Sequence, residues 1–327
     1  MDTEYGLSLV IPTFNKAAYL DLTLESLQYQ TFPVQKYEIV VVDDGSADRT
    51  EQVVASHKRT LNIRYVQQDN RGRSAARNQG TMLAQSELLV FIDDDLLLVK
   101  NFLEEHFRFH ENQRRTVAHG RIFELPFLKF FQDPTAGVLL ESERDKMSAN
   151  PSILQKFLVR KSDIPSLSRI DHQKKLSSLE RYIIEILMVP DTHESTKHLR
   201  FLGCTGGNIS MRKELLLEAG GFDPEFARLW GGEDMELGYR LQQLGADFQY
   251  LDRAINYHMT HLRKNYQEQL LKSFSLFYQK HQDPIIQALP QLLLNEWKGL
   301  PEFCEYIAKV VNCVMPLDVK DCRNDSA

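Results

Sequence analysis

An apolar run that ends in three adjacent carboxylates constrains this chain more than any other feature. Residues 88–92 have the composition of a buried strand, and Asp93, Asp94 and Asp95 follow them directly. Three like charges beside a buried strand repel one another and resist desolvation, so they need a counter-cation nearby. A hard divalent metal is the natural candidate, because carboxylate oxygens suit Mg²⁺ and Mn²⁺ and these ions usually bind substrate phosphates as well. The run therefore indicates a nucleotide-diphosphate site, with a solvated acidic turn as the alternative.

Composition excludes several classes of protein. The 327 residues are 43% hydrophobic with a formal net charge of -6, which is typical of a globular protein and argues against a dedicated nucleic-acid binder. The four cysteines form no CxxC pair and have no zinc-site spacing with histidines, so we expect free thiols in a reducing compartment. The N-terminus lacks the features of a signal peptide, and no apolar run approaches the ~18 residues of a spanning helix. A cytoplasmic protein is expected, with peripheral membrane contact left open.

The first 115 residues alternate short apolar runs with helical periodicity, which predicts a parallel α/β sheet. Strands are expected at residues 7–11, 38–42, 63–66 and 88–92. Each of these runs ends in polar residues, and ligands of open α/β sheets bind outside the carboxyl ends of the strands. The pattern then changes to a helical insertion, a glycine-rich block and a helical tail, at residues 121–200, 201–265 and 266–327. The apolar stripes of the tail are expected to complete the core or to form an oligomer interface.

Two motifs at consecutive strand ends are spaced like parts of one pocket. Val-Ile-Pro-Thr-Phe-Asn occupies residues 10–15, and Val-Val-Asp-Asp-Gly-Ser occupies residues 41–46. Backbone amides and Asp44 in these motifs could face a base and its ribose, because a carboxylate can accept a hydrogen bond from the N–H of a uracil ring. Each motif taken singly is equally consistent with a simple turn.

A basic segment precedes the acidic strand. Residues 70–78 place Arg71, Arg73 and Arg77 around a glycine where a helix is expected to begin. Helix N-termini and guanidinium groups both favour phosphate. Its position favours a ligand role for Arg77 over the other two arginines, and the alternative is a solvated basic face.

A second block of motifs lies in the glycine-rich region. Glycines beside Trp230 and the pair Glu233-Asp234 permit close backbone approach to a sugar ring that lies against an aromatic face. Asp234 is expected to open a helix, and an acidic N-terminus that merely complements the helix dipole is the alternative. His258 and His261 follow, three residues apart. Since the carboxylates need a metal, His258 is a candidate nitrogen ligand, which would favour Mn²⁺ over Mg²⁺.

In this order, the motifs of the first 115 residues resemble glycosyltransferase family 2 with the GT-A fold, and the later block is similar to the catalytic module of β-1,4-galactosyltransferases. The resemblance implies an α/β, Rossmann-like, mostly parallel sheet flanked by helices, with a helical insertion and a helical C-terminal tail. It makes residues 1–120 a nucleotide-sugar-binding half and residues 201–265 the catalytic and acceptor-binding half of the same domain. Residues 121–200 then form the insertion, and residues 266–327 form a C-terminal extension.

The resemblance also implies roles for individual residues. Asp234 is the general base, Asp95 and His258 bind the metal, and Trp230 and Glu233 contact the acceptor. The residues implied in nucleotide-sugar binding are Pro12, Thr13, Asn15, Asp44, Arg77, Asp93, Asp94 and Gly207.

The activity implied is an inverting transfer of a hexose or N-acetylhexosamine from a UDP-sugar to an acceptor hydroxyl, with Mn²⁺ or Mg²⁺ as cofactor. The acceptor is a glycan, a lipid-linked molecule, a peptide or a small molecule, nucleic acid is not a partner, and the C-terminal helices offer a route to a homo-oligomer. Two other functions remain open at this stage: a metal-dependent nucleotidyltransferase, and a non-catalytic protein that binds nucleotide-sugars.

Overall fold

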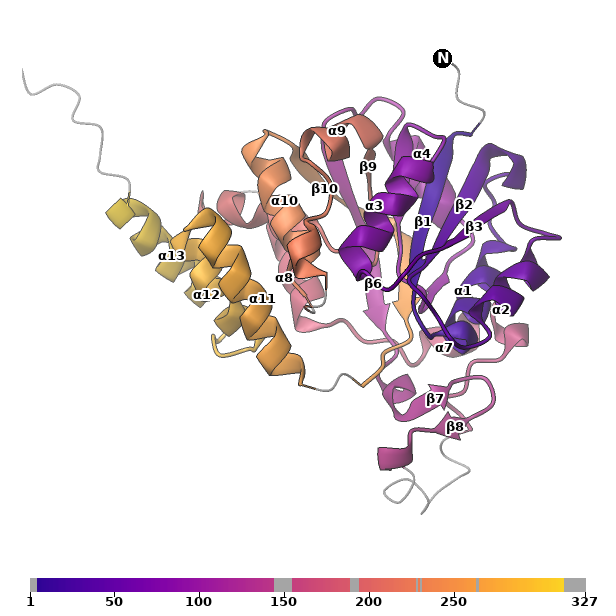
Figure 1. Ribbon diagram of the computed structural model, residues 1–327. Coiled ribbons are helices and arrows are strands. Elements are labelled where there is room, and N and C mark those ends of the chain that lie inside the picture. The colour runs from indigo at the N-terminus through magenta and orange to yellow at the C-terminus, as the bar shows by residue number, and fades with distance from the viewer. Residues whose placement is uncertain are drawn as a thin grey trace, which may run out of the picture.

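The computed structural model describes residues 5–143, 155–188, 194–227, 229, 231–262 and 265–314. At the centre of the described residues is an eight-stranded sheet with the order β3-β2-β1-β4-β9-β6-β10-β5 (Figure 1). Neighbouring strands are parallel except at β9 and β5, which run antiparallel to their neighbours. The strands span Leu7–Thr13 (β1), Tyr37–Asp43 (β2), Ile63–Gln67 (β3), Leu88–Phe91 (β4), Leu96–Leu98 (β5), Thr116–Glu124 (β6), Ile209–Arg212 (β9) and Asp247–His258 (β10).

The four strands expected within the first 92 residues are all present, and their ends lie within two residues of the expected ones. Strands β1, β2 and β4 are buried at every position. This pattern is typical of parallel strands with helices on both faces, which are apolar throughout rather than alternating. The expected α/β sheet is therefore confirmed.

Helices cover both faces of the sheet. Leu9 and Val10, adjacent in β1, belong to different clusters of the core, because successive side chains of a strand point to opposite faces. The Leu9 face is covered by α1 (Ala17–Leu27), α2 (Thr50–His57) and α4 (Phe102–Phe109). The opposite face is covered by α3 (Arg73–Leu83), α8 (Ser178–Met188), α9 (Lys213–Glu218) and α10 (Glu233–Gln243).

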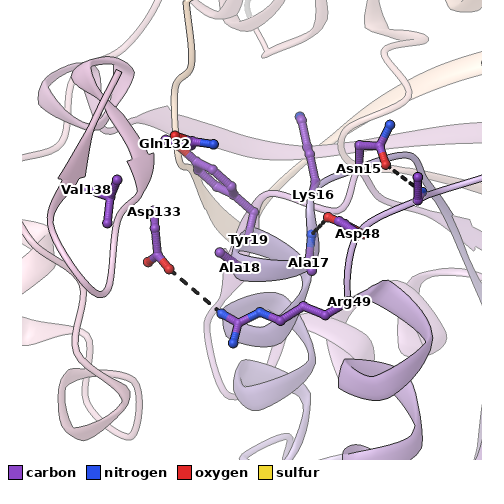
Figure 2. Close-up of a pocket in the computed structure, with 11 residues that line it drawn as sticks. Asn15, Lys16, Ala17, Ala18, Tyr19, Asp48, Arg49, Gln132, Asp133 and Val138 are labelled. Carbon is purple, nitrogen blue, oxygen red and sulfur yellow. Dashed lines mark hydrogen bonds and ion pairs between the residues drawn. The ribbon is translucent and has the colours of Figure 1, made fainter. Parts of the chain in front are cut away.

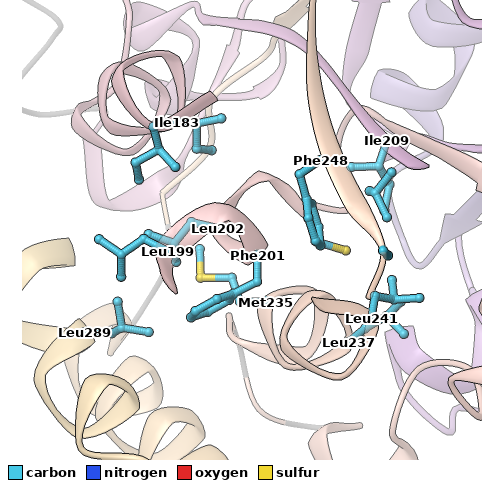
Figure 3. Packing of buried hydrophobic residues seen from close by; sticks show 14 of the residues in the cluster. Ile183, Leu199, Phe201, Leu202, Ile209, Met235, Leu237, Leu241, Phe248 and Leu289 are labelled. Carbon is cyan, nitrogen blue, oxygen red and sulfur yellow. The ribbon is translucent and has the colours of Figure 1, made fainter. Parts of the chain in front are cut away.

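The C-terminal helices complete the core of the second face. They are α11 (Tyr266–His281), α12 (Pro284–Leu293) and α13 (Leu300–Val314). Phe277 and Leu289 are fully buried in the same cluster as Phe201 and Met235. Figure 3 shows Leu289 beside Phe201 and Met235. The apolar stripes of the tail thus pack against the domain. An oligomer formed through these helices stays a prediction.

The segment expected to be a helical insertion is mixed in structure. Its first residues continue strand β6, and helices α7 (Ser168–Asp171) and α8 follow later. Between β6 and α7 lie β7 (Phe131–Asp133) and β8 (Val138–Leu139), which pair as a small antiparallel sheet. Single-turn 3₁₀ helices join these elements, at Pro126–Phe130, Glu141–Glu143 and Lys161–Asp163. No helix in the described parts of the chain is long and apolar enough to cross a membrane.

Candidate active site

The acidic triplet lies in the turn between β4 and β5, at the carboxyl end of the parallel strands. Its three carboxylates contact different partners. Asp93 accepts from the Arg77 guanidinium at 2.9 Å, Asp94 accepts from the Thr13 hydroxyl at 2.7 Å, and Asp95 accepts from Lys16 Nζ at 2.6 Å. Lys16 Nζ also lies 3.5 Å from Asp94. The expected counter-cations are therefore present in Lys16 and Arg77, and a bound metal beside them stays a prediction.

Two histidines converge on Asp95. His258 is the last residue of β10 and pairs with Leu96 of β5 in the antiparallel register, which brings its ring beside Asp95. His258 Nε2 and His261 Nδ1 lie 3.5 Å and 3.1 Å from the Asp95 Oδ2 atom. One ligand atom from each of these three residues lies within 4.8 Å of the others. The pair predicted for the metal, Asp95 and His258, is thus joined by His261.

The donor set of this cluster fits a bound Mn²⁺ ion. Asp95 Oδ1 is buried and has no hydrogen-bond partner among the described residues, so one carboxylate oxygen remains to bind a ligand. His258 Nδ1 contacts the Glu124 carboxylate at 2.8 Å, the contact by which an outer carboxylate commonly orients a metal-binding imidazole. Two imidazoles and one carboxylate suit Mn²⁺ better than Mg²⁺, which prefers oxygen ligands.

Opposite charges hold this cluster together. Burial disfavours the charged form of His258, but the carboxylates of Glu124 and Asp95 outweigh it and raise the pKa of His258 to about 10. Although burial acts in the other direction, Lys16 and His258 hold the pKa of Asp95 well below its usual range. Asp95 is therefore ionised, as a metal-binding carboxylate must be, whereas His258 has to give up its extra proton before it can bind a metal.

Asp234 lies in the first turn of α10, which begins one residue earlier, at Glu233. Its carboxylate accepts from the backbone N–H of Gly206 at 2.8 Å and from that of Met235 at 2.9 Å. Burial raises the pKa of Asp234 to about 6, the charge of Glu233 adds to this, and Arg77 and the Gly206 amide oppose it. A carboxylate with such a pKa is ionised at neutral pH and is a stronger base than an ordinary aspartate.

One cavity of about 590 Å³ joins Asp234 to the metal cluster. Asp93, Gly207, Asp234 and His258, four residues predicted for the site, all line it. Its far wall is apolar and comes from α11 and α12, including Leu270, Phe274 and Leu293. The structure therefore brings a candidate base and a candidate metal site to a single hollow.

Glu233 and Arg77 lie beneath this cavity and do not line it. Arg77 is 0% exposed and Glu233 is 1% exposed. Arg77 and Arg73 contact the same Glu233 oxygen at 3.1 Å and 3.0 Å, which ties α3 to the start of α10. A Cβ atom on Gly206 would lie 2.1 Å from the Arg77 guanidinium, so the close approach of this loop requires a glycine. The predicted contacts of Arg77 with the nucleotide and of Glu233 with the acceptor stay predictions, and Trp230 lies outside the described residues.

The residues predicted to face the nucleotide order the loops at the ends of β1 and β2. Pro12 and Thr13 are the last residues of β1, and Asn15 follows with a left-handed φ of 52°. Asn15 Oδ1 accepts from the N–H of Ala47 at 2.8 Å. Asp44 accepts from the N–H groups of Arg71 and Gly72 at 2.9 Å and 2.8 Å, and from Gln68 Nε2 at 2.7 Å. Asp44 therefore holds the loop before α3, and its contact with a base stays a prediction.

A second cavity, of about 650 Å³, lies between the N-termini of α1 and α2 and the small sheet β7–β8 (Figure 2). Asn15, Lys16 and Tyr19 line one side, and Asp133 lies across from Arg49 at 3.8 Å. Lys16 thus borders this cavity while its amine contacts the acidic triplet. The residues that line this second cavity include neither the candidate base nor a candidate metal ligand.

Sequence reasoning missed two contributors to the site. Lys16 directly follows the motif of residues 10–15, but nothing in its neighbours distinguishes it from a solvated lysine. Glu124 lies at the end of β6, and its contact with His258 depends on the parallel pairing of β6 with β10. The sequence did offer an indication for His261, because it lies only three residues after the predicted metal ligand His258.

Comparison with known sequences places two family models on the chain. The model described as glycosyl transferase family 2 matches residues 8–146, and the model described as N-terminal domain of galactosyltransferase matches residues 191–264. The chondroitin synthase of Pasteurella multocida is 32% identical over 271 residues, covering 79% of this chain and 25% of that protein. The validoxylamine A glucosyltransferase of Streptomyces hygroscopicus is 32% identical over 242 residues, covering 73% and 52%. The chain thus spans a quarter to about half of the length of these relatives.

Solved structures share the fold at low sequence identity. TarS of S. aureus, residues 1–349 in complex with UDP-GlcNAc, has a TM-score of 0.54 at 19% identity, covering 89% of this chain and 70% of that chain. The mannosyltransferase PcManGT from Pyrobaculum calidifontis, in complex with GDP-Man and Mn²⁺, has a TM-score of 0.54 at 16% identity, covering 94% and 74%.

Proposed function

Because the chain belongs to glycosyltransferase family 2 and has the GT-A fold, we propose that it transfers a hexose or N-acetylhexosamine from a UDP-sugar to an acceptor hydroxyl with inversion. The observation that carries the proposal is the single cavity shared by Asp234 and His258. A base on one side and a cation site on the other are the two groups that a displacement at an anomeric carbon needs.

The reaction is a single displacement in which Asp234 is the general base. Asp234 takes the proton of the acceptor hydroxyl as that oxygen bonds to the anomeric carbon, and the bond from this carbon to the diphosphate breaks. Because the acceptor oxygen enters opposite the departing UDP, the configuration at the anomeric carbon inverts. Asp234 is the group for this task because it lines the cavity with a raised pKa, whereas Glu233 is buried against Arg73 and Arg77.

Asp95, His258 and His261 would hold the metal ion, which supplies positive charge to the diphosphate that leaves. Glu124 orients His258, and Lys16 neutralises Asp95 and Asp94 from the other side. Mn²⁺ is the ion we propose, on the grounds of the two nitrogen ligands.

Two features support a nucleotide-sugar donor, and uracil is the base that we propose for it. Solved neighbours carry UDP and UDP-GlcNAc, although another carries GDP-Man. Asp44 and Asn15 lie at the ends of adjacent strands, where the base of a nucleotide binds in open α/β sheets. The acceptor that we propose is a glycan, a lipid-linked molecule, a peptide or a small molecule, which would enter the cavity beside its apolar wall from α11 and α12.

A screen of UDP-sugars tests this function without knowledge of the acceptor. The purified chain is incubated with Mn²⁺ and UDP-glucose, UDP-galactose, UDP-GlcNAc or UDP-GalNAc, and the release of UDP by slow donor hydrolysis is measured. We expect at least one donor to release UDP, and chelation of the metal to abolish this release. Release of pyrophosphate from a nucleoside triphosphate would establish a nucleotidyltransferase instead. Tight binding of a UDP-sugar with no hydrolysis or transfer would establish a non-catalytic binding protein.

A further inference from the structure

Three buried polar side chains form a hydrogen-bonded series that ends at the wall of the cavity that contains Asp234. Glu180 of α8, His119 of β6 and Thr205 of the loop before β9 are 3%, 1% and 9% exposed. Glu180 Oε2 lies 3.1 Å from His119 Nε2, and His119 Nδ1 lies 3.2 Å from the Thr205 hydroxyl. The first residue lies in the segment 121–200, and the last lines the cavity beside Gly207. The series therefore connects that segment to the wall of the active site.

The remaining hydrogen bonds of Glu180 favour one direction for these contacts. The other oxygen of Glu180 accepts from the N–H of Ile122 at 3.1 Å and from the hydroxyl of Tyr250 at 2.6 Å. With both donors on Oε1, we assign the proton between Glu180 Oε2 and His119 to His119 Nε2. In the neutral imidazole the other nitrogen is then an acceptor, and it accepts from the hydroxyl of Thr205.

The same loop holds the candidate base. Thr205 precedes Gly206, whose N–H donates to Asp234 Oδ2 at 2.8 Å. On its other side, Gly206 packs so closely against Arg77 that no side chain fits. Asn256 of β10 also holds the loop, since its Nδ2 donates to the Gly207 carbonyl at 2.9 Å. The Thr205 hydroxyl adds the contact with His119, and it belongs to the residue directly before Gly206.

We propose that Glu180, His119 and Thr205 form a positioning unit that keeps the Gly206 N–H directed at Asp234. This inference rests on the proposed function, in which Asp234 is the base, and it assigns a role to α8 within the segment 121–200. The unit does not touch the reacting atoms. It acts through one backbone amide on the group that does.

The consequence is measurable, because the Gly206 amide is one of several groups that set the ionisation of Asp234. A hydrogen bond to a carboxylate favours its charged form, so loss of this bond raises the pKa of Asp234 further above the ordinary aspartate value. The other charged and titratable groups that face Asp234 or border its cavity are Glu233, Arg73, Arg77, Cys204, Asp93, Glu124, His258, His261 and Tyr266, and the substitutions at Thr205 change none of them. A change in the pKa of Asp234 that follows a substitution at Thr205 therefore reports on the hydrogen bond from the Gly206 N–H.

The test compares Thr205→Val, which removes the hydroxyl with little change of shape, with Thr205→Ser, which keeps it. The full-length chain is labelled with ¹³C at aspartate side chains, the signal of Asp234 is assigned with Asp234→Asn, and its titration is followed without metal or substrate. We expect a midpoint near 6 for the parent chain. Thr205→Val should raise it by about half a unit to one unit, the effect of roughly one amide hydrogen bond, and Thr205→Ser should restore it. Equal midpoints in all three chains, or equal shifts in both variants, overturn the proposal.

A second measurement needs no variant and covers the case in which Thr205→Val does not fold. Ring ¹⁵N shifts of His119 in the parent chain should identify the neutral tautomer with its proton on Nε2. A proton on Nδ1, or a doubly protonated ring at neutral pH, overturns the proposal. Both measurements are independent of turnover. If they succeed while no UDP-sugar is hydrolysed or transferred, the positioning unit stands and the proposed function fails.

Discussion

Adjacent carboxylates at the start of α10 experience opposite environments. Burial raises the pKa of Asp234 to about 6, whereas Arg73 and Arg77 outweigh the effect of burial on Glu233 and lower its pKa. When their surroundings move the pKa values of two neighbouring acids in opposite directions, the acid with the raised pKa is the candidate for proton transfer. Asp234 also lines the cavity, and Glu233 does not. Geometry and ionisation thus favour the same residue.

Asp234→Asn should remove the base without removing the donor site. We expect kcat to fall by about 10²–10⁴, while the affinity for UDP with Mn²⁺, measured by calorimetry, stays within about twofold of the parent value. In the parent enzyme, protonation of Asp234 should inactivate it below its pKa, so activity should decline as the pH falls through about 6. Asp247→Asn serves as control, because that side chain is 51% exposed and pairs with Arg200. Loss of UDP affinity together with turnover would indicate a structural role for Asp234.

Asp95→Ala tests the proposed metal site. Asp95 is the carboxylate on which His258 and His261 converge, so its loss should abolish the dependence of UDP affinity on Mn²⁺. Calorimetric titration of UDP with and without Mn²⁺ measures this. Asp133→Ala, at the other cavity, should keep the full metal dependence. Unchanged Mn²⁺ dependence in Asp95→Ala would remove this residue from the metal site.

At the scale of elements, the active site depends on how α3, the acidic turn and α10 are joined. Arg77 contacts Asp93 and Glu233 at once, and its guanidinium also lies 5.2 Å from the centre of the Phe222 ring. A buried ion pair is weak evidence for net stability, but removing one partner leaves the other charge buried without compensation. Arg77 is therefore a structural link between the parts of the site.

Arg77→Met should lower the free energy of unfolding by about 3–5 kcal/mol, because it leaves the buried Glu233 and the partly exposed Asp93 short of a counter-charge. Arg73→Met is the matched control. Arg73 contacts the same Glu233 oxygen, but its side chain is 35% exposed, so we expect a smaller loss. Chemical denaturation of both variants measures the difference. Equal losses would show that burial of the arginine does not decide the effect.

At the scale of the whole molecule, the three C-terminal helices belong to the same cooperative core as the sheet. Their apolar stripes pack with Phe201, Met235 and Leu237, residues that surround the start of α10. The helices also form the apolar wall of the cavity. A change in the tail is therefore expected to reach the site through packing.

Adjacent leucines of α11 test this packing. Leu270 is 2% exposed and Leu271 is 51% exposed. Leu270→Ala should cost about 2–5 kcal/mol of unfolding free energy, because it removes buried methyl groups and leaves a cavity. Leu271→Ala should change it by no more than about 0.5 kcal/mol. Thermal and chemical unfolding measure both. A large loss for Leu271→Ala would instead indicate that this face of α11 is covered in solution, as an oligomer interface requires.

The sequence by itself determined the first half of the sheet and the location of the site. Strands β1 to β4 are local apolar runs bounded by polar turns, so their burial and their ends can be read without knowledge of the partners. The site then follows from one rule, since the carboxyl ends of parallel strands meet at one edge of a sheet. The helix predicted to open at Asp234 is also present, and it begins one residue earlier, at Glu233.

Only the tertiary structure decided which charges compensate one another. Lys16 faces Asp95, His258 reaches it through the β5–β10 register, and Arg77 is buried beneath Gly206. The tertiary structure also decided that Glu180, in the segment 121–200, contacts His119 of β6. These contacts join residues tens to more than a hundred positions apart. Sequence periodicity reports on neighbours along the chain, whereas an ion pair depends on distance and burial in space, which strand register and helix packing set.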